Sequence, residues 1–316
     1  MHYNGKNITG RGAFMISKLV QEIRANWAKS DAERDRGLTT PEDIVRYDDI
    51  SYGPYGEWNL LDIYYTKDTK ATGPAIVSIH GGGWVYGSKE VYQYYCMKLA
   101  QRGFTVVNFN YRLAPENPYP AALEDINQVF SYLVQHGEEY FVDTNNLFVV
   151  GDSAGAQLAS QYLAALTNPE YAKMLGFETP EVTVRAAALN CGIYDIKNLG
   201  LQVVELADRI REYMSGDPEK RKGTGSGSWE SLNVMKYITG NFPPAFVMSA
   251  YHDYLRKHAK PMYEHLTGLG VDCRLEIYGT KEQKHMGHVF HVDCRSKEAD
   301  QCNDEECAFF RKYIKV

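Results

Sequence analysis

The sequence predicts an α/β fold in which a mostly parallel β-sheet carries helices on both faces. Short runs of apolar, β-branched and aromatic residues recur along the chain, and helical patterns separate most of them. No repeat with a period of 20–50 residues is present, which excludes solenoids and propellers. Strands that alternate with helices indicate parallel pairing, because a parallel connection needs a crossover long enough to hold a helix.

The first predicted elements are a helix and an antiparallel strand pair. Apolar residues from Ile16 to Trp27 recur at helical spacing, so we expect a helix over residues 14–29. The charge run 31–36 and Thr40-Pro41 are expected to end it. The runs 44–50 and 60–65 flank a turn-rich segment, which is typical of two antiparallel strands.

The remaining elements complete the alternation. The further predicted strands are 75–79, 104–109, 147–150, 185–189, 245–250 and 273–278. The further predicted helices are 89–101, 121–135, 154–166, 203–214, 255–269 and 297–314.

One long insertion interrupts the pattern between residues 190 and 242, where no strong strand is visible. Such an insertion in an α/β sheet is usually functional, often a lid over the site. Here it follows the carboxyl end of a strand, where these sheets bind ligands. We therefore favour a lid over a passive surface excursion.

Composition limits the function classes and the location. The net charge is −6, from 34 basic and 40 acidic residues, and no basic face indicates nucleic-acid binding. No stretch reaches 18 apolar residues, so we expect no membrane span and no membrane partner. Six scattered cysteines and a polar beginning without the pattern of a secretory signal predict reduced thiols and a cytoplasmic location.

The segment Gly151-Asp152-Ser153-Ala154-Gly155 is the strongest candidate for chemistry. It follows a predicted buried strand and precedes a predicted helix, which is the context of a nucleophile elbow. Glycines on both sides allow the sharp turn, and the free N–H groups of the helix start point at developing negative charge. Ser153 is the predicted nucleophile.

A second glycine-rich segment, His80-Gly81-Gly82-Gly83, directly follows the predicted strand 75–79. Backbone N–H groups of Gly82, Gly83 and Ala154 are the predicted donors of an oxyanion hole. A phosphate-binding loop is the alternative, but it would continue into Gly-Lys-Ser/Thr, which is absent here. We expect His80 to hold this loop by hydrogen bonds.

Four segments occur in an order that resembles a known family. They are residues 80–83, Tyr111 to Glu116, Pro120 to Asp125 and Gly151 to Gly155. The sequence is similar to the hormone-sensitive-lipase-like branch of the α/β-hydrolases, the HGGG-type carboxylesterases, over about residues 45–290. The resemblance implies one domain over residues 1–316, an eight-stranded sheet with its second strand antiparallel, and a small cap built from about 1–40 and about 191–242.

The resemblance also implies a Ser, Asp or Glu, His order for a catalytic triad. Asp253 follows a predicted strand at its carboxyl end, where the acid must lie, whereas Asp272 precedes a strand and Asp195 opens the insertion. Three histidines, His285, His288 and His291, follow the last strand. The family pattern selects His288 as the base, although Val289 stands where glycine is commoner.

Two other features could indicate a functional site but also have a simpler structural explanation. His285, His288, His291 and Cys294 recur every three residues, but in a loop this spacing does not gather ligands, so we expect no metal site. No cofactor is expected. Trp84 follows the glycines and is a candidate wall of the substrate pocket, with plain core packing as the alternative.

These observations predict a serine hydrolase that cleaves short- to medium-chain carboxylesters through an acyl-enzyme. The first alternative is a sugar or xylan acetyl esterase with the same triad. A non-catalytic ligand-binding member of the fold is the second alternative, but every triad position has a candidate here. The expected partner is a small-molecule ester, with a homodimer left open beside a monomer.

Overall fold

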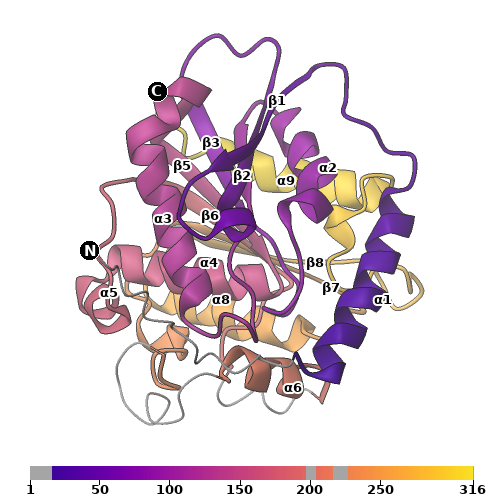
Figure 1. Cartoon of the computed structure of the whole chain (residues 1–316), viewed down its shortest axis with the longest axis vertical. Coiled ribbons are helices and arrows are strands. Elements are labelled where there is room, and N and C mark those ends of the chain that lie inside the picture. The colour runs from indigo at the N-terminus through magenta and orange to yellow at the C-terminus, as the bar shows by residue number, and fades with distance from the viewer. Residues whose placement is uncertain (1–15, 197–203, 216–226, 316) are drawn as a thin grey trace, which may run out of the picture.

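The computed structural model describes residues 16–196, 204–215 and 227–315. It contains one eight-stranded sheet with the strand order β1-β2-β4-β3-β5-β6-β7-β8 (Figure 1). The strands are β1 (Ile44–Ser51), β2 (Leu60–Thr66), β3 (Gly73–Ile79), β4 (Thr105–Phe109), β5 (Val142–Asp152), β6 (Val184–Asn190), β7 (Ala245–Ala250) and β8 (Cys273–Tyr278). This is the fold class that the sequence predicts.

The second strand runs against the rest of the sheet. β2 is antiparallel to both of its neighbours, β1 and β4, whereas every pair from β4 to β8 is parallel. The antiparallel pair predicted for 44–50 and 60–65 is therefore confirmed, as is the antiparallel second strand. Because the other strands share one direction, their carboxyl ends meet at one edge of the sheet, where such folds place their sites.

Helices cover both faces of this sheet (Figure 1). They are α1 (Lys18–Asp35), α2 (Lys89–Ala100), α3 (Ala121–His136), α4 (Ala154–Thr167), α5 (Pro169–Leu175), α6 (Val204–Tyr213), α8 (Ala259–Gly268) and α9 (Lys297–Arg311). One apolar core joins the sheet to α3, α4 and α8, and a second joins it to α2 and α9. Alternate residues of β3 supply both, with Val77 in the first core and Ile76 in the second.

Two sequence predictions about helices were wrong in detail. The charge run 31–36 does not break α1, which continues to Asp35, because Arg34 is held by Asp31 at 2.9 Å and by Asp35 at 2.6 Å. The predicted helix 255–269 begins only at Ala259 and is preceded by a short 3-10 turn. Across the described residues, every helix is too short or too polar to span a bilayer.

Candidate active site

Ser153 lies in the sharp turn between β5 and α4. Its φ of 54° and ψ of −117° put it in a strained region that a non-glycine residue rarely adopts. A Cβ on Gly151 would stand 2.4 Å from the carbonyl oxygen of Gly155, and a Cβ on Gly155 would stand 2.0 Å from that of Ile79. The turn therefore needs glycine on both sides of the serine, as the sequence pattern predicts.

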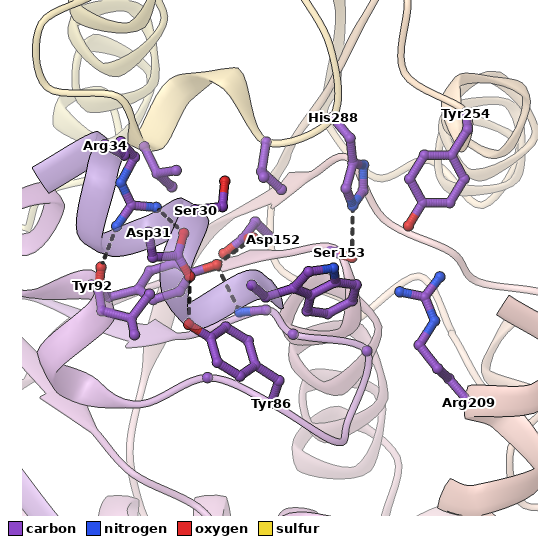
Figure 2. Close-up of a pocket in the computed structure, with 18 residues that line it drawn as sticks. Ser30, Asp31, Arg34, Tyr86, Tyr92, Asp152, Ser153, Arg209, Tyr254 and His288 are labelled. Carbon is purple, nitrogen blue, oxygen red and sulfur yellow. Dashed lines mark hydrogen bonds and ion pairs between the residues drawn. The ribbon is translucent and has the colours of Figure 1, made fainter. Parts of the chain in front are cut away.

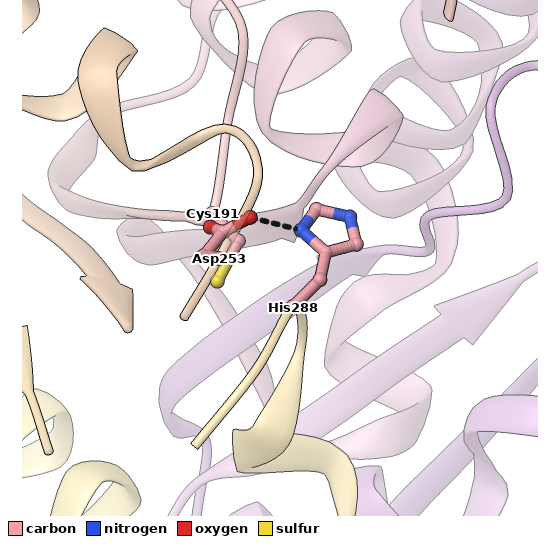
Figure 3. Close-up of side chains that lie close together, drawn as sticks. All are labelled: Cys191, Asp253 and His288. Atoms are coloured by element: carbon pink, nitrogen blue, oxygen red, sulfur yellow. Dashed lines mark hydrogen bonds and ion pairs between the residues drawn. The ribbon is translucent and has the colours of Figure 1, made fainter. Parts of the chain in front are cut away.

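The three predicted triad residues form one hydrogen-bonded chain. The Oγ of Ser153 is 2.9 Å from Nε2 of His288 (Figure 2). Nδ1 of His288 is 2.7 Å from Oδ1 of Asp253 (Figure 3). Each comes from a loop at the carboxyl edge of the sheet: Ser153 follows β5, Asp253 follows β7 and His288 follows β8. Asp272 lies at the other edge, where its carbonyl pairs with the first residue of β7.

Asp253 is buried, and three groups form hydrogen bonds with its carboxylate. Besides His288, the hydroxyl of Ser249 donates to Oδ2 at 2.7 Å and the N–H of Leu255 donates to Oδ1 at 2.8 Å. Burial raises the pKa of Asp253, but the hydrogen bond and charge of His288, with smaller contributions from Ser249 and Leu255, outweigh it. The net pKa is below the ordinary value, so the carboxylate is ionised beside the imidazole.

Cys191 lies directly beside this chain (Figure 3). Its Sγ, a ring nitrogen of His288 and a carboxylate oxygen of Asp253 all lie within 4.8 Å of one another. Burial raises the pKa of the thiol well above its usual value, with a further rise from the charge of Asp253. A cysteine that binds a metal must be a thiolate, and the raised pKa disfavours that form. The hydrogen bond between His288 and Asp253 also occupies one nitrogen and one oxygen that a metal would need.

The other residues weighed as metal ligands are dispersed. His285 is exposed and faces Glu298, 3.5 Å away. His291 is buried with its ring edge-to-face against Tyr95. Among the described residues, Cys191, Asp253 and His288 are the one group of three potential ligands that the structure brings together, and sequence spacing gave no sign of it.

The segment 80–83 forms a tight glycine turn beside Ser153. Gly82 has a φ of 114°, and a Cβ there would stand 1.9 Å from the carbonyl oxygen of Tyr86, so no other residue fits. Nδ1 of His80 lies 2.7 Å from the carbonyl oxygen of Gly81, and the ring stacks on Tyr111. Burial lowers the pKa of His80 to about 4, so the ring is neutral. His80 thus contacts the loop by a hydrogen bond and by stacking.

Tyr92 and Asp152 are joined to the same glycine turn by hydrogen bonds. The hydroxyl of Tyr92 donates to Oδ2 of Asp152 at 2.7 Å and accepts the N–H of Gly81 at 3.1 Å. Burial raises the pKa of Asp152 to about 6, partly offset by the hydrogen bond from Tyr92. These contacts couple the residue before Ser153 to the glycine turn.

A cavity of about 320 Å³ opens above Ser153 and His288 (Figure 2). It is lined by residues of α1, α2 and α6, of the glycine turn and the turn that carries Ser153, and of the loops after β7 and β8. The lining residues are Trp27, Ser30, Asp31, Arg34, Gly81, Gly82, Gly83, Tyr86, Gly87, Val91, Tyr92, Asp152, Ser153, Arg209, Tyr254, His288, Val289 and Val292.

Trp84 does not line this cavity, so its prediction as a pocket wall was wrong. Its side chain is 1% exposed, its ring stacks on Tyr213 and its Nε1 donates to Gln157 at 2.9 Å. Trp84 has a left-handed φ of 63°, and its indole contacts Gln157 of α4 and Tyr213 of α6. The tryptophan that reaches the cavity is Trp27 of α1.

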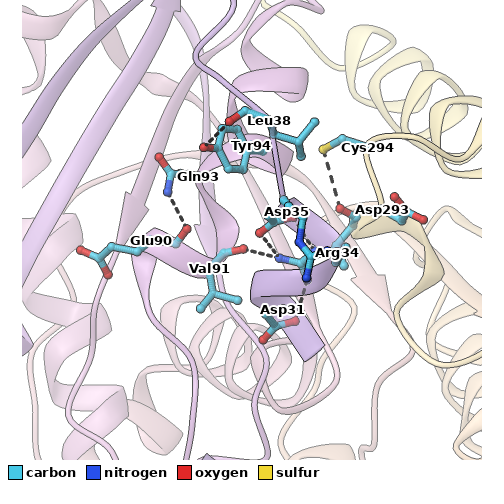
Figure 4. A network of polar contacts seen from close by, with 12 residues as sticks. Asp31, Arg34, Asp35, Leu38, Glu90, Val91, Gln93, Tyr94, Asp293 and Cys294 are labelled. Atoms are coloured by element: carbon cyan, nitrogen blue, oxygen red, sulfur yellow. Dashed lines mark hydrogen bonds and ion pairs between the residues drawn. The ribbon is translucent and has the colours of Figure 1, made fainter. Parts of the chain in front are cut away.

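Polar contacts attach the carboxyl-terminal end of α1 to neighbouring segments (Figure 4). Arg34 donates to the carbonyl oxygen of Val91 in α2 at 2.7 Å while it is paired with Asp31 and Asp35. Further along the chain, Arg295 donates to the carbonyl oxygens of Arg34 and Arg36. These contacts join α1 to α2 and to the loop that follows His288.

Comparison with known proteins identifies the family. The family model described as BD-FAE matches residues 61–262. The chain belongs to the BD-FAE family. It is also 32% identical over 223 residues to the probable carboxylic ester hydrolase LipM of Mycobacterium tuberculosis, covering 70% of this chain and 51% of LipM. The esterase LipQ of the same organism is 30% identical over 241 residues, covering 71% and 55%.

Other relatives of this BD-FAE member match over more of their length. An acetyl esterase of Salmonella typhi is 27% identical over 277 residues, covering 83% of this chain and 79% of the relative. The crystal structure of esterase B from Lactobacillus rhamnosis superposes with a TM-score of 0.83 at 24% identity, over 93% of this chain and 95% of that one. That likeness shows that the two chains share a fold. The chain spans about half the length of LipM and LipQ.

Proposed function

We propose that this BD-FAE member is a serine carboxylester hydrolase. The observation that carries the proposal is the chain of hydrogen bonds from Ser153 through His288 to Asp253. An imidazole that contacts the hydroxyl on one side and an ionised carboxylate on the other is arranged to take a proton from the serine. The esterase names of LipM, LipQ and the Salmonella acetyl esterase support the same chemistry.

The proposed reaction proceeds through an acyl-enzyme. Ser153 Oγ attacks the ester carbonyl while Nε2 of His288 takes the hydroxyl proton and returns it to the leaving alcohol. Asp253 fixes the tautomer of His288 and stabilises the imidazolium. The N–H groups of Gly82, Gly83 and Ala154 stabilise the oxyanion. Water then attacks the acyl-enzyme with His288 as base, and Ser153 is regenerated.

Replacement of the nucleophile tests the mechanism. We expect Ser153→Ala to lower kcat for 4-nitrophenyl acetate by about 10⁴-fold or more, as in other Ser-His-Asp enzymes. Circular dichroism and the unfolding midpoint would show that the variant is folded. A variant that kept a tenth of the wild-type rate would refute the proposal.

We also propose that the substrates have short to medium acyl chains. The cavity of about 320 Å³ is at the lower end of the range of ligand pockets, about 300–1,000 Å³. Side chains of α1 and Arg209 of α6 stand over it, which supports a cap built from the N-terminal segment and the insertion. With 4-nitrophenyl esters from C2 to C12, kcat/KM should be higher for C4 than for C12.

A sugar acetyl esterase with the same triad is the second candidate. The polar wall formed by Ser30, Asp31 and Asp152 favours it, because hydroxyl-rich alcohols need such partners. Acetylated xylose and acetylated xylan, assayed beside the aryl esters, distinguish the two. Acetate release from either sugar ester with a kcat/KM above that for 4-nitrophenyl acetate would select the second candidate.

A further inference from the structure

A buried arginine of α6 stands at one end of the cavity. Arg209 is 5% exposed, and it lines the cavity together with Ser153 and His288. A Cβ on Gly83 would stand 2.9 Å from Cδ of Arg209 and 3.3 Å from its Nη1. The arginine side chain therefore lies against the glycine turn that we propose as the oxyanion hole.

Aromatic side chains hold the guanidinium in this position. Its Cζ lies 5.1 Å from the centre of the Trp27 ring, within the range of a cation–π contact. Tyr254 lines the same part of the cavity, and Figure 2 shows its hydroxyl between His288 and Arg209. The Tyr254 ring packs against the imidazole of His288, with 4.5 Å between the ring centres. Two donors, a guanidinium and a phenol, thus stand beside the catalytic histidine.

The charges of the cavity are divided between its ends. Figure 2 shows Asp31, Arg34 and Asp152 on one side of Ser153, and Arg209 with Tyr254 on the other. At the first end Arg34 pairs with both Asp31 and Asp35, at 2.9 Å and 2.6 Å, so carboxylates outnumber guanidinium groups there. An anionic substrate group is therefore better placed at the second end, beside the positive charge of Arg209.

We propose that Arg209, together with Tyr254, binds a carboxylate carried by the ester substrate a few bonds from the scissile carbonyl. This deepens the proposed esterase function and rests on it. A guanidinium presents a planar fork of N–H donors that matches a carboxylate, and its affinity is greatest where water is excluded. The substrates implied are half-esters of dicarboxylic acids or acylated hydroxy acids.

Matched pairs of neutral and anionic esters test this inference. Monomethyl succinate and methyl succinamate place a carboxylate or an isosteric amide on the acyl side, and O-acetyl glycolate and O-acetyl glycolamide place them on the alcohol side. In a pH-stat assay the wild type should favour the carboxylate member of one pair by kcat/KM. Arg209→Gln should lower that carboxylate-to-amide ratio by about 10- to 100-fold, the usual worth of a charge-assisted hydrogen bond.

Arg211→Gln is the matched control, because Arg211 is on the same helix with its side chain 65% exposed, paired with Asp208. It should leave the ratio unchanged. The inference is overturned if the wild type shows no carboxylate preference in either pair, or if Arg209→Gln keeps the wild-type ratio. Equal losses on carboxylate and amide esters would also overturn it, because they indicate a role toward the oxyanion.

A second measurement needs no variant. Benzoate should inhibit the wild type competitively at least about fivefold more strongly than benzamide, since the two differ mainly in charge. Equal inhibition would contradict the inference. If the wild type hydrolyses 4-nitrophenyl acetate but shows neither preference, only the inference about Arg209 fails. If it hydrolyses no ester, the proposed function fails, and calorimetric titration with benzoate still tests the anion site.

Discussion

The hydroxyl of Ser249 donates a 2.7 Å hydrogen bond to Oδ2 of Asp253, the oxygen opposite the one that contacts His288. This bond fixes the plane of the carboxylate and helps to lower the pKa of Asp253. Ser249 does not line the cavity, so we expect it to act as a positioning residue through Asp253. It is the next-to-last residue of β7, and its side chain is buried.

We expect Ser249→Ala to lower kcat about 3- to 30-fold, with a smaller effect on KM, since a lost hydrogen bond to a charged group costs about 1.5–3 kcal/mol at most. The carboxylate becomes more basic without this donor, so the acid limb of the kcat/KM profile should move to higher pH. The measurement is a pH–rate series with 4-nitrophenyl acetate. Ser160→Ala, which removes another buried hydroxyl from α4, should not move the profile; an unmoved profile in Ser249→Ala would reject the role.

Gly155 is expected to be indispensable for folding. A Cβ there would meet the carbonyl oxygens of Ile79 and His80 at 2.0 Å and 2.6 Å, and both are backbone atoms that cannot yield cheaply. Gly155→Ala should therefore destabilise the protein by more than about 3 kcal/mol, the upper range for overpacking. Urea unfolding measures this loss directly.

The control is Gly268→Ala at the end of α8, where a Cβ meets nothing within 4 Å. Alanine there should raise the free energy of unfolding by at most about 1 kcal/mol, because it restricts the unfolded chain and favours the helix. Equal stability of the two variants would contradict the close approach of α4 to β3.

The turn that carries Ser153 was predictable because local chemistry dictates it. Gly151 and Gly155 flank a serine between a strand and a helix, and the structure gives each glycine a backbone neighbour that excludes a side chain. The prediction of Asp253 and His288 also required the expected position of the site at the carboxyl edge of the sheet, together with the family resemblance. Val289 shows why glycine is commoner after this histidine: its φ of 54° is in the left-handed region.

The parts that sequence did not predict depend on tertiary placement. Cys191 and Ser249 carry no pattern, and they matter only because β6 and β7 end beside the same carboxylate. Arg209 belongs to a charged amphipathic helix, and only the position of α6 brings it into the cavity. Trp84 was misplaced because its packing against Tyr213 and Gln157 depends on where α6 and α4 lie. α5 was missed because seven residues show too little periodicity.

Glu306 is expected to make the protein less stable as the pH rises. It is fully buried against Asn190, and burial raises its pKa to about 7. The pKa of Glu306 is about 4.5 in the unfolded chain and higher in the folded protein. Its contribution to the free energy of unfolding is therefore fully present below pH 4.5, and it is lost as the pH rises through 7. Glu306→Gln should thus be more stable than the wild type at pH 8 by about 2–3 kcal/mol, and near equal to it at pH 4.5.

Glu305 provides an internal control on the same helix. Its pairing with Arg274 helps to lower its pKa, so Glu305→Gln should not be stabilising at pH 8. Urea unfolding of both variants at pH 5 and pH 8 decides the matter. Parallel stability curves for Glu306→Gln and the wild type would show that Glu306 does not titrate in this window.

The three histidines after β8 should separate into three behaviours. His288 contacts both Ser153 and Asp253, so His288→Asn should be as inactive as Ser153→Ala. The ring of His285 is exposed toward Glu298, so His285→Asn should keep the wild-type rate and stability. His291 is buried against Tyr95, so His291→Asn should lose about 1–3 kcal/mol of stability but keep its turnover per folded molecule.

The pH dependence distinguishes His291 further. Burial lowers its pKa to about 3, with a further lowering from the charge of His288, while the unfolded value is about 6.5. Between about pH 6.5 and pH 3 the His291 imidazole is protonated in the unfolded chain but neutral in the folded protein. The free energy of unfolding of the wild type therefore decreases as the pH falls through this range. The stability gap between the wild type and His291→Asn should therefore narrow on acidification. If His291→Asn were inactive while folded and His288→Asn remained active, the base would have to be reassigned to His291.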